Sequence, residues 1–181
     1  IDKDLVFVPI NACRIIDTRA AGGQLVAGTA RHFDVTALSD YAFQGGEATN
    51  CGGLGAAGSF AALAVNFTVI NPNASGTLKA WAFLAAEPSV ADAMSFAAGE
   101  VRSNFHIVKI DQGASANEMS VKSSVTAHLT ADVVGYFKAA PLPTLQCVET
   151  GNTNLPVAAG SIGNSVAPAC AAGYVRTSTN C

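Results

Sequence analysis

The sequence predicts an all-β chain: an antiparallel sandwich or barrel-like domain of roughly 8–10 strands, followed by a small tail stapled by disulfides. Apolar and polar residues alternate along several short segments, which is the period of a half-buried strand. Clusters of Gly, Pro, Asn and Ser separate these segments at regular spacing, as turns do. The Ala-rich stretch 85–100 is interrupted by Pro88 and Gly99, so we expect no helix there.

Strand signals follow one another through the first 137 residues. Two β-branched runs open the chain, and Gly22-Gly23 follows them. Within 60–70, the large apolar residues from Leu63 to Val69 occupy every second position, so they share one face of a strand. The expected strands are residues 4–10, 12–18, 30–36, 60–70, 77–84, 104–110, 118–122 and 124–137.

A strong turn signal, residues 71–76 (NPNASG), separates the segments 60–70 and 77–84. We therefore predict that these two segments form a long hairpin. Residues 40–58 contain Gly45-Gly46 and Gly52-Gly53 and are expected to be a loop. Small residues occupy the second faces of several strands; such faces can be solvated or can pack against another sheet or subunit, and the scarcity of charge favours packing against a subunit.

The chain is expected to divide at residues 139–143 (AAPLP), a Pro-containing linker. Residues 1–138 form the predicted β-rich module. Residues 144–181 form a Cys-containing tail, or the start of a second small module, because large apolar residues become sparse there. A tail with so little core needs covalent cross-links.

Cysteine usage points to an oxidising compartment. The five cysteines form no C-x-x-C pair and only three His accompany them, so a tetrahedral zinc site is a poor interpretation. Disulfides persist outside the cytosol, which predicts an extracellular or cell-surface protein. In the tail we expect a Cys147–Cys170 bridge. Cys181 is then unpaired or intermolecular, and its closing position also fits a natural protein that continues beyond it.

Charge and hydropathy limit the classes of partner. Ten Lys and Arg stand against 13 Asp and Glu, a formal net charge of −3, which provides no basic field for nucleic acid. The chain contains no run of about 18 apolar residues, so the sequence predicts no membrane span. Charged residues make up 13% of the chain, about half the usual share. We expect copies of the chain itself, other surface proteins or glycans as partners, and no cofactor.

Residues 7–19 (FVPINACRIIDTR) resemble the "P-x-R-x-x-D-T-R" opening of a β-rich module that recurs in secreted and cell-surface proteins of bacteria. Further segments agree in order, and the closing ADVVGYF at 131–137 resembles the end of that module, "D-V-x-G-Y-F". The resemblance covers about residues 5–138. After Cys51 the family pattern usually has Ile-Pro where this chain has Gly52-Gly53, so that loop differs.

The resemblance implies a Cys13–Cys51 disulfide that ties the first strands to the loop before the central strands. Such a bridge would close a loop of about 37 residues and contribute roughly 3–4 kcal/mol in the chain-entropy model. The resemblance implies no shared enzymatic activity and no particular ligand. It implies an architectural or adhesive role, because the module occurs as repeats or as a terminal part of large exported proteins.

Arg14, Asp17 and Arg19 are the first candidate site. These residues could clamp a charged ligand, but a hydrogen-bonded structural ion pair between Asp17 and one Arg is the favoured interpretation. In a regular strand, Asp17 and Arg19 share one face and Arg14 lies on the other.

Trp81, Phe83 and Tyr41 are the second candidate site, a possible platform for stacking of sugar rings. Trp81 and Phe83 share one strand face, although ordinary core or interface packing is the commoner role of aromatic residues.

The remaining residues give little support to an enzyme. His106 and His128 lie on expected strands and could face each other, but no carboxylate accompanies them at ligand spacing, so we predict no metal site. No G-x-S-x-G nucleophile motif is present. The sequence therefore predicts a non-enzymatic structural or adhesive module that self-assembles into a surface fibre or oligomeric tip. The alternative is a carbohydrate-binding module of a larger secreted protein.

Overall fold

The computed structural model describes residues 4–37, 39–52, 54, 58–140 and 158–160. The chain divides into two units, Ile1–Leu142 and Pro143–Cys181. Of the second unit, residues 158–160 alone are described. The predicted Cys147–Cys170 bridge and the predicted state of Cys181 lie outside the described residues.

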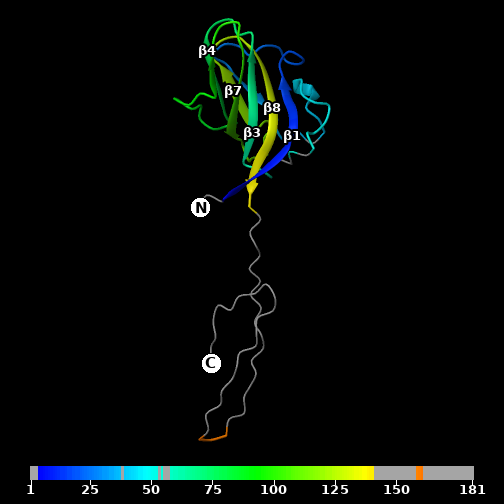
Figure 1. Cartoon of the computed structure of the whole chain (residues 1–181), viewed down its shortest axis with the longest axis vertical. Helices are drawn as coiled ribbons and strands as arrows, with labels where there is room; N and C mark the ends of the chain where they lie inside the picture. Colours follow the sequence, from blue (N-terminus) through cyan, green and yellow to red (C-terminus); the bar gives the residue numbers. More distant parts are fainter. Residues whose placement is uncertain (1–3, 38, 53, 55–57, 141–157, 161–181) are drawn as a thin grey trace. The chain divides into compact units, whose positions relative to one another are not determined.

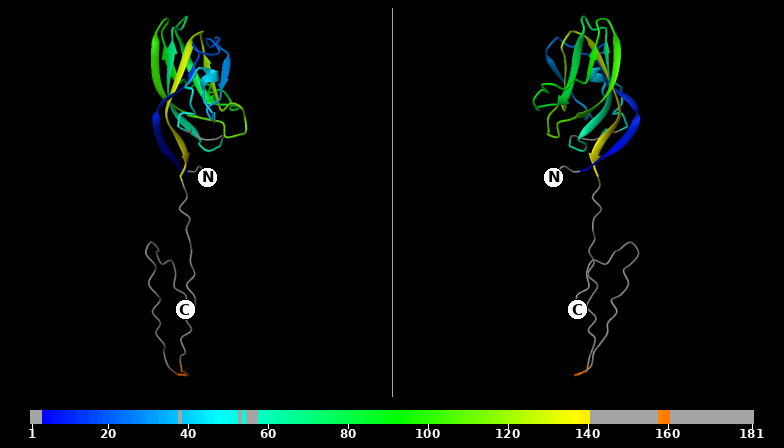
Figure 2. Two further views of the ribbon diagram at one scale, coloured as in Figure 1. Left: turned by 90° about the vertical axis from the view of Figure 1, so that its right-hand side faces the viewer. Right: turned by 60° about the vertical axis from the view of Figure 1, so that its left-hand side comes forward.

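The first unit is an antiparallel β-sandwich, which confirms the predicted fold class (Figure 1). Eight strands form two four-stranded sheets, and these lie against each other as two layers (Figure 2). The first sheet has the order β1-β8-β3-β6 and the second the order β2-β7-β4-β5. The strands are β1 (Leu5–Asp17), β2 (Ala30–Phe33), β3 (Ala62–Ile70), β4 (Gly76–Ala82), β5 (Met94–Phe96), β6 (Val101–Lys109), β7 (Met119–Ser123) and β8 (His128–Ala139).

Successive strands alternate between the two sheets, except that β4 and β5 are neighbours in the second sheet. The predicted hairpin of 60–70 and 77–84 is therefore wrong: β3 belongs to the first sheet and β4 to the second. Alternation shows that each strand has one apolar face, but it does not show which strand is its partner. In a sandwich, the apolar faces of β3 and β4 meet across the core instead of lying side by side.

The core lies between the inner faces of both sheets. Leu63, Val65, Phe67 and Val69 of β3 are fully buried, as their alternation predicts. From the second sheet, Leu78 of β4 and the apolar residues of β7 join the same hydrophobic cluster. The outward residues of each strand therefore form two outer faces, one on each sheet.

Two predicted strands, 4–10 and 12–18, form one long strand with local irregularities. Arg14 pairs with Asp132, and Ile16 pairs with Ala131, so Ile15 is an extra residue that has no partner in the register. Such a bulge shifts the alternation by one position. Ile15 and Ile16 are both fully buried as a result, and Arg14 and Asp17 both reach the outer face.

The free edge of β1 is covered by the connection between β2 and β3. Gly45 forms a bridge with Ile16, and the Glu47 backbone N–H donates to the Arg14 carbonyl at 2.8 Å. Gly45 has a φ of +84°, and a side chain there would collide with the Asp17 carbonyl, so glycine is required. The 3-10 turn Ala42–Gln44 belongs to this connection.

A disulfide joins Cys13 of β1 to Cys51 of the same connection, with the two Cα atoms 5.6 Å apart. This confirms the pairing that the resemblance implies. The bridge closes a sequence separation of 38 residues, which includes β2. It therefore ties one edge of the first sheet to the connection between β2 and β3.

We predict that replacing both Cys13 and Cys51 by Ser lowers the free energy of unfolding by about 3–4 kcal/mol, because the loop-closure constraint on the unfolded chain is lost. Guanidinium unfolding monitored by circular dichroism measures the change. Ala12→Ser, an exposed change beside the bridge, is the matched control. A double variant as stable as the control would contradict a structural role for this bridge.

Candidate functional surfaces

Four charged residues form an ion-pair network on the outer face of the first sheet: Arg19, Asp17, Arg14 and Asp132. The Arg14 guanidinium donates to both carboxylate oxygens of Asp132, Nε to Oδ1 at 2.8 Å and Nη2 to Oδ2 at 3.0 Å. Arg19 donates in the same two-pronged way to Asp17, at 2.9 and 2.7 Å. Arg14 Nη1 also lies 3.4 Å from Asp17 Oδ2, which links the two pairs. The signs alternate along the network, so its net charge is zero.

The structure brings Arg14, Asp17 and Arg19 together, but the prediction that Arg14 lies on the opposite face is wrong because the Ile15 bulge changes the alternation. Sequence reasoning missed Asp132, the main partner of Arg14. Its signal was an acidic residue on the outward face of the long alternating segment 124–137. Since all four side chains satisfy one another, the network fastens β1 to β8 and offers no open clamp for a ligand.

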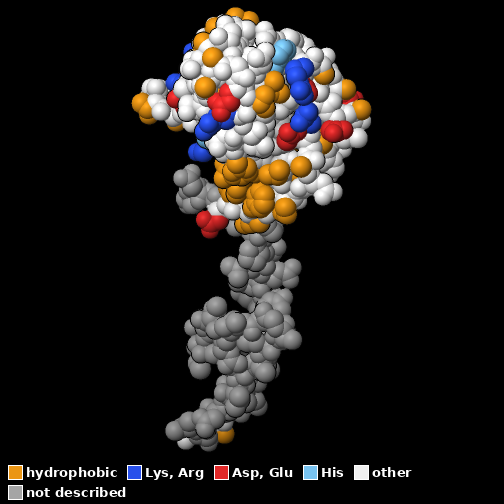
Figure 3. All heavy atoms as spheres, turned by 45° about the horizontal axis from the view of Figure 1, so that its top comes forward, with side chains coloured by type: hydrophobic (Ala, Val, Ile, Leu, Met, Phe, Trp, Pro, Cys, Tyr) orange, Lys and Arg blue, Asp and Glu red, His pale blue; other side chains and the backbone are white. Residues whose placement is uncertain are grey.

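Exposed hydrophobic side chains concentrate on the same sheet. Ten large hydrophobic residues are exposed among those described, and six of them lie on the edge strands β1 and β6; the other four lie outside the strands. The six are Leu5, Val6, Phe7, Val101, Phe105 and Ile107. Figure 3 shows hydrophobic side chains gathered next to paired charges on the β-sandwich.

Strand register places several of these side chains on one continuous outer surface. Ile107 lies opposite Ala64, and Ala64 lies opposite Gly135 on its other side. The Phe7 ring rests directly on Gly135, where any side chain would collide with it. Phe7 also contacts the Phe137 ring at 5.2 Å between centroids. We call the surface formed by Phe7, Phe137, Gly135, Ala64, Phe105 and Ile107 the apolar face.

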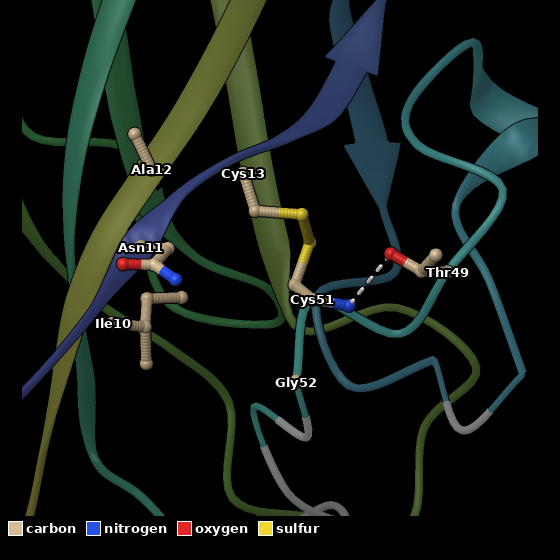
Figure 4. Close-up of a pocket in the computed structure, with 7 residues that line it drawn as sticks. All are labelled: Ile10, Asn11, Ala12, Cys13, Thr49, Cys51 and Gly52. Atoms are coloured by element: carbon tan, nitrogen blue, oxygen red, sulfur yellow. Dashed lines mark hydrogen bonds between the residues drawn. A yellow bond between two sulfur atoms is a disulfide. The ribbon is translucent and has the colours of Figure 1, made fainter.

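A depression of about 400 Å³ lies beside the Cys13–Cys51 bridge (Figure 4). Its lining contains no ionisable side chain; the residues are Ile10, Asn11, Ala12, Cys13, Thr49, Cys51 and Gly52. Thr49 Oγ1 accepts a hydrogen bond from the Cys51 backbone N–H at 3.4 Å. The polar side chains of this depression, Asn11 and Thr49, provide no acid, base or activated nucleophile.

The predicted platform of Trp81, Phe83 and Tyr41 is only partly assembled. Trp81 and Phe83 are half-buried on the outer face of the second sheet, as expected from their spacing. Tyr41 is fully buried, and its hydroxyl donates to the Val35 carbonyl at 3.0 Å, so its place in the platform is a wrong prediction. Val35, Tyr41 and Phe60 of the connection between β2 and β3 belong to the core cluster, which loop-like composition does not reveal.

Two unpredicted features lie beside Trp81 on the second sheet. His32 on β2 is hydrogen-bonded through Nδ1 to Ser120 Oγ at 3.0 Å. Its ring packs edge-on against the Phe83 ring. Lys79 and Lys122, directly opposite each other in the register, both approach the Glu87 carboxylate. The sequence places one Lys on the outward face of each of two strands, β4 and β7. The pairing of these strands is needed to show that the two lysines meet.

Glu118 is a buried carboxyl group, 1% exposed, just before β7. Its Oε2 accepts the Val35 backbone N–H at 2.9 Å. Burial raises the pKa of Glu118, and the nearby Asp34 carboxylate raises it further. A raised pKa is typical of a catalytic acid, but this group is closed off from solvent and its hydrogen bond holds the connection after β2.

The three histidines are separated in the structure. His106 pairs with Val65 on the inner side of the first sheet, whereas His128 pairs with Ile70 on the outer side. The expectation that His106 and His128 face each other is therefore wrong. Burial lowers the pKa of His106. Within the described residues, no three His, Cys, Asp or Glu side chains are grouped to hold a metal ion.

In the part of the chain that the structure describes, no helix has the length and apolar character to cross a bilayer. Comparison of the chain with protein-family models, with curated proteins and with solved structures finds no match. The resemblance of residues 7–19 and 131–137 to the bacterial surface module therefore stays a prediction.

We predict that Asp17→Asn lowers the free energy of unfolding by roughly 1–2 kcal/mol at neutral pH, because the charged partner of Arg19 and Arg14 is lost and both guanidinium groups are partly screened by solvent. Hydrogen bonds from Arg19 hold the pKa of Asp17 below its ordinary value of 3.8. The stabilisation is therefore complete above that value and is lost as pH falls through the lower pKa of the folded state.

Urea unfolding of the wild type and of Asp17→Asn at about pH 7 and about pH 3 tests this linkage. The difference between the two proteins shrinks at the acidic pH. Asp92→Asn, in the exposed β4–β5 connection, is the control. A difference that stays constant with pH would rule out the ion pair as its source.

We predict the opposite trend for Glu118→Gln. Because the folded-state pKa of Glu118 is raised, its contribution to stability is complete below its ordinary pKa of 4.5 and is lost as pH rises through the folded value. Gln keeps an oxygen for the Val35 N–H and does not ionise. The stability of this variant relative to the wild type should therefore increase with pH above 4.5 in urea unfolding. A relative stability that falls with pH would contradict the assignment.

Proposed function

We propose that this chain is a non-enzymatic extracellular structural or adhesive module that associates with a second copy of itself through the apolar face. The observation that carries the proposal is the concentration of exposed hydrophobic side chains on β1 and β6 of one sheet. Phe7, Phe105 and Ile107 are 44%, 53% and 51% exposed. Exposed apolar surface of this kind marks an interaction site in soluble proteins.

The charge distribution favours a second copy as the partner. The ion-pair network beside the apolar face is neutral and alternates in sign, so two copies can approach without strong like-charge repulsion. The whole chain is only 13% charged, which lowers the desolvation cost of covering a large surface. An isologous contact, in which the same surface is used by both copies, is the commonest arrangement in homodimers.

The extracellular part of the proposal rests on the disulfide. Cys13–Cys51 closes a long segment of the β-sandwich, and such bridges persist in oxidising compartments. The non-enzymatic part rests on the chemistry of the surfaces. The depression beside the bridge contains no ionisable side chain, and the one carboxyl whose pKa is raised among the described groups is closed off from substrates.

Replacing Phe105 and Ile107 by Ser tests the association. Both side chains are exposed in the single chain, so folding should be preserved. We expect the dissociation constant of the oligomer to rise at least about 30-fold, which corresponds to roughly 2 kcal/mol for two contact side chains. Light scattering after size exclusion, from roughly 10 µM to roughly 1 mM, measures it.

Val26→Ser with Phe43→Ser is the matched control, since these exposed side chains lie outside the strands. Free thiols are blocked with iodoacetamide under native conditions, so that intermolecular disulfides do not mimic association. A wild-type chain that is monomeric over the whole concentration range would refute the proposal. Equal dissociation constants for the test and control variants would show that another surface mediates contact.

A further inference from the structure

We propose that the outer face of the second sheet is a binding site for a carboxylate-bearing saccharide, with a sugar ring stacked on Trp81 and its carboxylate held by Lys79 and Lys122. The site uses the sheet opposite to the apolar face, so it does not depend on the association proposed above. Its two ends are a pair of ammonium groups and an aromatic cluster, joined along β4.

The lysine end is a shallow depression of about 240 Å³ lined by Thr77, Lys79, Glu87, Lys122 and Ser124. Lys79 on β4 and Lys122 on β7 are direct cross-strand partners. Like charges in this position repel each other unless an anion lies between them. Glu87 supplies one such anion: its carboxylate receives two hydrogen bonds from Lys122, at 2.8 and 3.1 Å.

One carboxylate does not neutralise two ammonium groups, so this depression keeps a surplus of one positive charge in a chain whose net charge is −3. Lys79 Nζ lies 3.7 Å from Glu87 and donates to the Pro88 carbonyl at 2.7 Å. An ammonium has three donors, so this hydrogen bond leaves capacity for a second carboxylate. The hydroxyls of Thr77 and Ser124 complete a lining that suits a sugar acid.

The β4–β5 connection holds this arrangement in place. The Ala85 backbone N–H donates to the Ala82 carbonyl at 3.1 Å, which turns the chain directly after β4. Leu84 in this turn has a φ of +64°, a left-handed conformation that is uncommon for a bulky residue. The turn leads Glu87 and Pro88 back to the lysine pair.

The aromatic end begins two residues further along β4. Trp81 and Lys79 share one face of β4, and their Cα atoms lie roughly 6–7 Å apart at about 3.3 Å per residue. The cross-strand neighbour of Trp81 is Ser120, which is 1% exposed although it lies on an outer face. Trp81 and His32 flank Ser120 in the register, one on each side of β7.

The His32–Phe83 pair beside Trp81 is already organised in the free protein. His32 is fixed by its hydrogen bond to Ser120 and by the Phe83 ring, whose centroid lies 4.7 Å away. A rigid aromatic surface loses little conformational entropy when a ligand binds. A pyranose offers an apolar face for Trp81 and hydroxyls for the nearby polar groups, whereas a simple anion would engage only the lysine end. An acidic saccharide is therefore the ligand class that uses both ends.

Titration calorimetry of the full chain with tetragalacturonate, at low ionic strength, tests the site; cellotetraose is the neutral probe. We expect saturable binding of tetragalacturonate that weakens with added salt and is at least about tenfold tighter than that of cellotetraose. Trp81→Ala should weaken binding of the acidic probe at least about tenfold. Lys79→Gln with Lys122→Gln should weaken it similarly and remove most of its salt dependence.

The matched controls are Phe43→Ala, an exposed aromatic residue outside the strands, and Lys109→Gln, an exposed lysine of β6 on the other sheet. Both should bind like the wild type. Thermal unfolding confirms that every variant is folded, and the lysine variant tests the site even if Trp81→Ala is destabilised. The proposal is overturned by absence of saturable binding at roughly 10 mM probe, by equal affinity for both probes, or by site variants that bind like their controls.

Discussion

The antiparallel pairing of β1 with β8 places the first strand of the sandwich beside its last strand. Through this pairing the Ile15 bulge brings Arg14 opposite Asp132, which completes the ion-pair network. The same pairing lays Phe7 on Gly135 and beside Phe137, which creates half of the apolar face. The Cys13–Cys51 bridge and the Gly45 contact then fasten the other edge of β1. The ion-pair network and half of the apolar face therefore share one cause.

The two outer faces of the sandwich differ in chemistry. The first sheet carries exposed hydrophobic side chains and charges that neutralise one another. The second sheet carries aromatic residues that are partly covered and a lysine pair that its carboxylate does not fully neutralise. Under the two proposals above, association with a second copy would use the first sheet and leave the second sheet available for a ligand.

Alternation of apolar and polar residues was sufficient to predict the all-β class, because burial of one strand face imposes a period of two. It does not identify strand partners, so it predicts a hairpin of 60–70 and 77–84 although β3 and β4 lie in different sheets. One inserted residue, Ile15, is enough to put Arg14 on the same face as Asp17, opposite to the face that strict alternation predicts. The burial of Tyr41 depends on the tertiary path of a long connection, which local sequence does not reveal. The pairing of Lys79 with Lys122 follows from the strand register, which alternation does not give.

The position of β1 beside β8 also has a consequence for folding. The first strand finds its partner only after more than a hundred further residues have been synthesised, as the Asp17–Thr130 and Leu5–Ala139 pairs show. Proteins dominated by such distant contacts fold slowly, because the entropy of closing the loop is lost before the contacts form. Folding of this sandwich must therefore wait until nearly the whole module has emerged. During that delay β1 has no neighbouring strand to accept its backbone hydrogen bonds, because β8 is its one strand partner in the sheet.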